Sequence, residues 1–142
     1  MADWRDNLGG AFEGGVRRTK EQEAAGITSF IRNVAIPAFE ELRSELEQYG
    51  RDVTLRRADT SATLIVYNGG VEEITYRIQS RTFPKGVVPF ADMRFKERGG
   101  LKLVRRESMF RSGDADYTIR DVSKQEVIEN FLSHYMPLVE RT

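Results

Sequence analysis

The chain of 142 residues contains no cysteine and only one histidine. The lack of cysteine excludes disulfides, Cys-ligated zinc, iron–sulfur clusters and thiol catalysis. No apolar run approaches the roughly 18 residues of a membrane-spanning helix. The N-terminus also lacks the ordered charged, apolar and small-residue regions of a signal peptide. These absences predict a cytoplasmic protein that makes no membrane contact.

Motifs for catalysis and cofactor binding are also absent. The glycines form neither a Walker loop nor a dinucleotide-binding loop. Adjacent carboxylates such as Glu40 and Glu41 do not face each other on a helix, and Asp114 and Asp116 lack the further oxygen ligands of a calcium loop. His134, the one imidazole, has no nucleophile or orienting group that the sequence nominates. We therefore predict no catalytic, cofactor-binding or metal-binding residue.

Charge is present in equal amounts of both signs but unevenly placed. The chain has 22 basic and 22 acidic residues. Residues 51–112 hold thirteen basic and seven acidic residues, whereas residues 19–50 and 113–142 each hold three basic and six acidic residues. A basic middle between acidic flanks is an argument about partners rather than about fold.

The first eighteen residues predict a flexible arm, followed by one domain over residues 19–142. Two glycine pairs in the arm disfavour a stable helix. Its apolar residues nevertheless recur every four positions, which would align them on one side of a helix formed on a surface. These residues are Trp4, Leu8, Phe12 and Val16. The arm is therefore either a disordered tail or a segment that docks on its own domain or on a neighbour.

Two amphipathic helices are predicted at the ends of the domain. Apolar residues from Ile27 to Tyr49 recur at helical spacing, and Gly50 follows as a stop signal. The apolar phase is unbroken around Pro37, which favours one kinked helix over two separate helices. The last helix begins at Ser123, which forms a capping box with Glu126.

The first predicted hairpin surrounds Asn68-Gly69-Gly70, between strands at 61–67 and 71–79. Asn-Gly between two such runs is a strong hairpin signal. A two- or four-residue loop pairs odd positions of the first strand with even positions of the second. The predicted core face then carries Ile65, Tyr67, Ile74, Tyr76 and Ile78. The opposite face carries an apolar patch of Leu64, Val66 and Val71.

The second predicted hairpin joins strands at about 90–97 and 101–108 through a three-residue loop. The core face of this hairpin would carry Ala91, Met93, Phe95, Leu101 and Leu103. The outer face would carry Asp92, Arg94, Lys96, Lys102, Val104 and Arg106.

Residues 52–57 alternate as another strand, and 117–120 predict a short last strand. The apolar segment Phe83–Phe90 is expected to be a connection with a turn at Pro84 to Gly86.

Together these elements predict an α+β fold with two layers. Both helices pack on one face of a four- to five-stranded antiparallel sheet, because that face offers the surface that their apolar sides require. The fold class names no function, since small α+β domains serve many unrelated ones.

Three hypotheses of function follow. The first is a non-enzymatic module that binds another protein or a second copy of itself, since exposed apolar patches often mark interaction sites. Its candidate interface is Trp4, Leu8, Phe12, Leu64, Val66 and Val71. The second is a nucleic-acid-binding domain with a basic outer sheet face of Arg56, Arg77, Arg94, Lys96, Lys102 and Arg106. The third is a small-ligand binder or enzyme with a cleft between helices and sheet.

Overall fold

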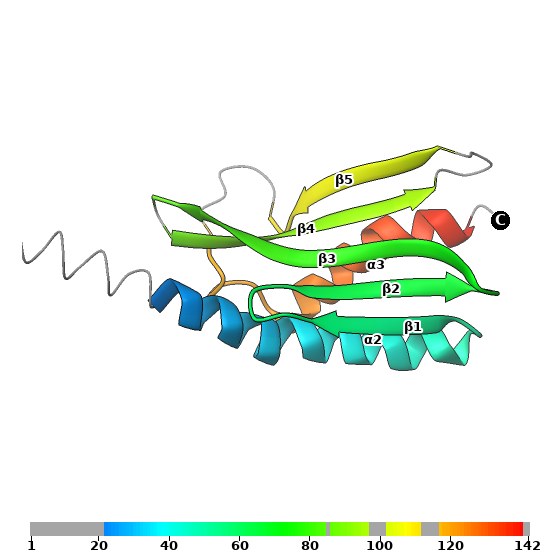
Figure 1. The fold of residues 1–142 in the computed structure, drawn as a ribbon, viewed down its shortest axis with the longest axis horizontal. Coiled ribbons are helices and arrows are strands. Elements are labelled where there is room, and N and C mark those ends of the chain that lie inside the picture. Colours follow the sequence, from blue (N-terminus) through cyan, green and yellow to red (C-terminus); the bar gives the residue numbers. More distant parts are fainter. Residues whose placement is uncertain (1–21, 85, 97–101, 112–116, 141–142) are drawn as a thin grey trace, which may run out of the picture.

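The computed structural model describes residues 22–84, 86–96, 102–111 and 117–140. Residues 22–30 are helical and run directly into η1. The elements are, in order, η1 (Ile31–Ala35), α2 (Ile36–Gln48), β1 (Asp52–Arg57), β2 (Ala62–Asn68), β3 (Val71–Phe83), β4 (Gly86–Lys96), β5 (Leu103–Met109) and α3 (Lys124–Glu140). The predicted α+β class is confirmed: the long helix lies alongside β1, and α3 lies behind the sheet (Figure 1).

The long N-terminal helix is continuous through Pro37, as predicted. Its π turn, Ile31–Ala35, directly precedes the proline, and the Ile36 amide donates to the Ile31 carbonyl five residues back. Proline lacks the amide that an α-helix needs and crowds the preceding turn. A π turn at this point changes the local hydrogen-bond pattern without ending the helix. The helix stops where expected, since Gly50 follows it with φ of 82°.

The sheet is an antiparallel meander in the order β1-β2-β3-β4-β5. The turn at Pro84 is where the sequence placed it, but the prediction of a long connection at 83–90 was wrong. Phe83 pairs with Gly86, and Ser80 pairs with Pro89, so both strands continue up to the turn. The Pro89 carbonyl accepts a hydrogen bond of 3.2 Å from the Tyr117 hydroxyl, which ties the segment before α3 to β4.

The predicted faces of β2 were wrong because β3 contains a bulge. Near the turn, Asn68 pairs with Val71 and Tyr67 with Glu72, as a two-residue loop requires. Beyond it, Val66 pairs with Ile74, so Glu73 is one extra residue on β3. A single extra residue reverses every later face assignment, because side chains alternate along a strand. The buried face therefore carries Ala62, Leu64, Val66, Ile74, Tyr76 and Ile78, all fully buried.

The predicted register of the second hairpin was also off by one residue. Phe95 pairs with Val104 and Arg94 with Arg105. Lys96 pairs with Leu103, whereas the predicted three-residue loop would pair Lys96 with Lys102. Val104 therefore packs against the core cluster, while Leu103 is 48% exposed.

The last strand expected at 117–120 is a turn. The Ile119 amide donates to the Val87 carbonyl at 3.1 Å, and the Asp121 amide donates to the Thr118 carbonyl at 3.0 Å. The start of α3 agrees with the sequence, because the Glu126 amide donates to the Ser123 hydroxyl at 3.2 Å. This contact is one half of the predicted capping box.

Aromatic side chains fix α3 to the sheet and to α2. The Tyr76 ring meets Phe39 and Phe131 edge-on, with centroids 5.9 and 5.3 Å apart. Phe131 also stacks on Tyr135 at 5.2 Å. All four side chains are buried, so this cluster forms the centre of the core between the helices and the sheet.

Candidate functional site

The face of the sheet away from α2 and α3, here called the outer face, carries a hollow of about 200 Å³. Two neighbouring rungs of paired residues cross it. One rung runs through Arg56, Thr63, Arg77 and Asp92, and the other runs through Ile65, Thr75, Arg94 and Arg105. Short side chains at Thr63 and Thr75 lie next to long arginines in these rungs, and we call the depression the arginine hollow.

Arginine charge exceeds carboxylate charge in the arginine hollow. Arg94 forms an ion pair of 3.4 Å with Glu72 at the rim. Arg77 donates to the Thr63 hydroxyl at 3.4 Å. Asp92, the one carboxylate in the lining, accepts from Gln79 at 3.3 Å. Within the described ranges, Arg56, Arg77 and Arg105 form no ion pair, so cationic groups remain available in this hollow.

The predicted basic surface is only partly assembled. Arg56, Arg77 and Arg94 line the arginine hollow, and Arg105 joins them although the sequence had not nominated it. Lys96 ends β4 and Lys102 precedes β5, and neither lines the hollow. Arg105 is identified by the register of β5, which places it opposite Arg94.

Arg106 faces the helices rather than the outer face. Its guanidinium lies 5.2 Å from the Phe95 ring centroid. Burial and, to a smaller extent, the charge of Arg106 hold the pKa of His134 on α3 below its usual value. Arg106 and Val104 were both predicted on the outer face. The one-residue change of register turns these even positions of β5 towards the helices.

The predicted apolar interface is not present as a surface patch. Leu64 and Val66 are fully buried in the core, because the bulge at Glu73 turns them towards the helices. Val71, at the tip of the hairpin, is 61% exposed. Trp4, Leu8 and Phe12 lie outside the described residues.

An exposed apolar groove instead lies between α2 and α3. It has a volume of about 840 Å³ and a mainly apolar lining. Residues of α2 from Glu41 to Leu46 and residues of α3 from Gln125 to Val139 form its walls. Tyr49 and Met136 at this groove are 73% and 42% exposed. We call this surface the α2–α3 groove.

A polar clamp lies at one end of the α2–α3 groove. The bulge turns Glu73 towards the helices, where its carboxylate accepts from the Tyr135 hydroxyl at 2.7 Å and from two nitrogens of Arg51 at 3.2 Å. Burial and the bond to Glu73 raise the pKa of Tyr135, which keeps the hydroxyl protonated and donating. The clamp joins β3, α3 and the segment after α2, so its role is to hold the groove walls.

A second polar link connects the sheet to α3. The Tyr76 hydroxyl donates to Asn130 at 2.6 Å, and the Asn130 amide donates to the Ser108 hydroxyl at 3.0 Å. Burial raises the pKa of Tyr76 far above its usual value. These groups are used in holding α3 and offer no free acid or base.

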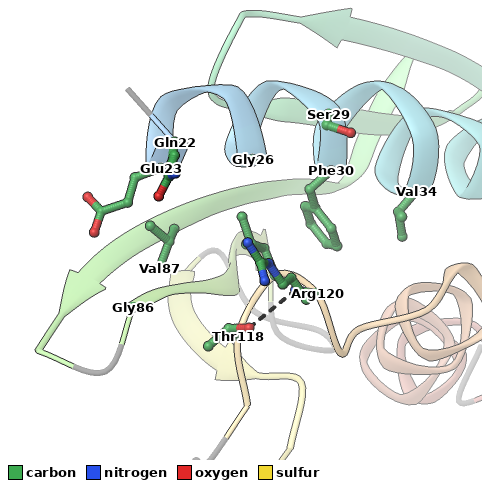
Figure 2. Close-up of a pocket in the computed structure, with 11 residues that line it drawn as sticks. Gln22, Glu23, Gly26, Ser29, Phe30, Val34, Gly86, Val87, Thr118 and Arg120 are labelled. Carbon is green, nitrogen blue, oxygen red and sulfur yellow. Dashed lines mark hydrogen bonds between the residues drawn. The ribbon is translucent and has the colours of Figure 1, made fainter. Parts of the chain in front are cut away.

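A third cavity, of about 540 Å³, separates the start of the long helix from the turn at 117–121. Figure 2 shows Phe30 and Val34 pointing from the helix towards Thr118 and Arg120. The helix and the turn lie close together at Gly26, where an added Cβ would lie 2.8 Å from the Ile119 side chain. Within the described lining, Glu23 and Arg120 are the titratable groups, and no hydrogen bond or ion pair joins them.

The described residues offer little for metal or membrane chemistry. None of them form a group of three or more His, Cys, Asp or Glu side chains placed to hold a metal ion. No helix in the described ranges combines the length and apolar character needed to cross a bilayer. Two candidate binding surfaces therefore remain. The α2–α3 groove exposes apolar side chains, and the arginine hollow holds more arginines than carboxylates.

In comparisons with known proteins, the chain matches no protein-family model, no curated protein and no solved structure.

Proposed function

We propose that this chain is a non-enzymatic self-association module, in which the arm of one copy occupies the α2–α3 groove of a second copy. The observation that carries the proposal is the exposed apolar groove itself, with Tyr49 and Met136 at 73% and 42% exposure. Large exposed apolar surfaces on soluble proteins mark interaction sites. Tyrosine and methionine are also enriched in the buried parts of protein interfaces.

The arm and the groove agree in length and character. A helix from Trp4 to Val16 would be about 18 Å long at 1.5 Å per residue. The α3 wall from Ile128 to Val139 is about 17 Å long on the same basis. Four apolar residues repeated at four-residue spacing would fill such a groove in the manner of helix-in-groove recognition.

The reach of the chain favours a second copy as the source of the arm. Residue 22 begins the described helix, and Glu41 at the near end of the groove lies about 28 Å further along it. Val16 is six residues before residue 22, which spans at most about 22 Å when fully extended. The arm of the same chain therefore falls short of placing all four apolar residues in the groove, whereas the arm of a neighbour has no such limit.

The test is the oligomeric state measured by sedimentation equilibrium. We expect the full chain to form a dimer, and we expect both deletion of residues 1–18 and Met136→Glu to shift it to monomer. Val71→Glu is the matched control, since it places the same charge on an apolar side chain that is 61% exposed at a hairpin tip. A monomeric full chain, or a dimer that survives the deletion, would overturn the proposal.

Alanine in place of glycine tests whether the arm docks as a helix. In the proposed helix, at 100° per residue, Gly10 and Gly14 would lie on the side opposite to the four apolar residues. Each Gly→Ala change favours a helix by about 1 kcal/mol, so Gly10→Ala with Gly14→Ala should tighten the dimer by more than tenfold. A weaker dimer would show that the arm binds in another conformation.

A further inference from the structure

The floor of the arginine hollow contains a hydroxyl with an unmet hydrogen bond. Thr75 Oγ1 is buried and has no hydrogen-bond partner among the described residues. A buried polar group without a partner is uncommon in folded proteins and calls for an explanation such as a bound ion. Thr75 lies in the middle of the sheet, between Ile65 on β2 and Arg94 on β4.

Positive charge is concentrated around this floor, although Glu72 at the rim pairs with Arg94. Arg94 and Arg105 are direct cross-strand partners. Like charges placed opposite each other destabilise a sheet. Arg56 and Arg77 approach the floor from the neighbouring rung. An anion bound among these side chains would remove the repulsion and accept the hydrogen bond of Thr75.

The size and the donors of the hollow indicate a class of anion. Its volume of about 200 Å³ is below the roughly 300–1,000 Å³ of pockets for drug-sized ligands. Arginine forks match the oxygens of phosphate in a bidentate manner. A lining of four arginines and one aspartate suits a doubly charged group better than a single carboxylate.

We propose that the arginine hollow binds the phosphate group of a phosphate monoester, with Arg77, Arg94 and Arg105 as cationic contacts and Thr75 as a hydroxyl donor. A small phosphorylated ligand is favoured over the backbone of a nucleic acid because the cationic surface is local. Lys96 and Lys102 do not line the hollow, and Arg106 faces the helices, so only part of the predicted basic surface gathers at this point.

The probes are inorganic phosphate and an oligonucleotide without a terminal phosphate, titrated at constant ionic strength. Arginine side-chain Nε–H resonances report the site directly. We expect saturable shifts with phosphate, and about tenfold weaker binding for Arg105→Gln because one charge-assisted contact is lost. Arg43→Gln is the matched control, since it makes the same change of charge on an exposed part of α2.

Three results would overturn this proposal. The first is the absence of saturable shifts with phosphate, and the second is an equal loss of affinity in Arg105→Gln and Arg43→Gln. The third is tighter binding of the oligonucleotide than of phosphate, which would assign the outer face to a polymer backbone. Salt dependence would accompany the third result, because neutralised phosphates release counterions.

Thr75→Val separates a ligand-binding role from a structural role. Valine keeps the shape and favours a strand, and it removes a buried hydroxyl that has no partner in the free protein. We expect the melting temperature to stay the same or rise while phosphate affinity falls several-fold. A lower melting temperature with unchanged affinity would remove Thr75 from the site.

Discussion

Replacing Phe131 with alanine is expected to lower the free energy of unfolding by about 3–5 kcal/mol. Phe131 is fully buried, stacks on Tyr135 and meets Tyr76 edge-on. The substitution removes apolar contact area, leaves a cavity between α3 and the sheet, and ends two aromatic contacts. Since natural domains are stable by only about 5–15 kcal/mol, this one change should remove a large share of the total.

The measurement is urea denaturation followed by circular dichroism. Glu129→Ala is the control, because this side chain lies on the same helix, is exposed and does not line the α2–α3 groove. We expect the control to change the unfolding free energy by no more than about 0.5 kcal/mol, as is usual for surface positions. Similar losses in the two variants would show that Phe131 is not the main packing contact of α3.

The effect on α3 would extend to the α2–α3 groove. The hydrogen bonds from Tyr76 to Asn130 and from Tyr135 to Glu73 depend on the position of this helix. Loosening α3 should therefore weaken the proposed dimer as well as the fold. Met136→Glu, in contrast, should weaken the dimer without a comparable loss of stability, and this difference separates the groove from the core beneath it.

The elements of this fold could be predicted because their signals are local. The apolar spacing from Ile27 to Tyr49 and the stop at Gly50 depend on neighbouring residues only, and so does the cap at Ser123. The turn at Asn68 is equally local, and the pairing next to it is the predicted one. Helices, hairpins and the α+β class therefore followed from the sequence.

The candidate site could not be predicted to the same extent because it depends on register. The residues around Glu73 give no sign of a bulge. The contacts that the bulge allows are with Arg51 and Tyr135, which lie far away in the chain. The register between β4 and β5 decides whether Arg105 or Arg106 joins the outer face. Each case is a shift of one residue, which leaves the strand intact but exchanges its two faces.

Two single-residue deletions should test this account of the bulge with opposite results. Deleting Glu73 removes the extra residue and gives β2 and β3 a regular ladder in which Val66 still faces Ile74. We expect this variant to fold and to lose only the polar clamp, so its stability should equal that of Glu73→Ala. Loss of such charged hydrogen bonds typically costs about 1.5–3 kcal/mol.

Deleting Ile65 should instead prevent folding. It brings Leu64 next to Val66, and both must face the helices, where each is fully buried. A strand cannot direct two consecutive side chains to one face without another bulge. Ile65→Ala is the control that loses the side chain but keeps the register, so we expect it to fold. Circular dichroism and one-dimensional NMR distinguish the variants. An unfolded Glu73 deletion beside a folded Glu73→Ala would show that the bulge itself is required, because the backbone would then need the extra residue irrespective of its carboxylate.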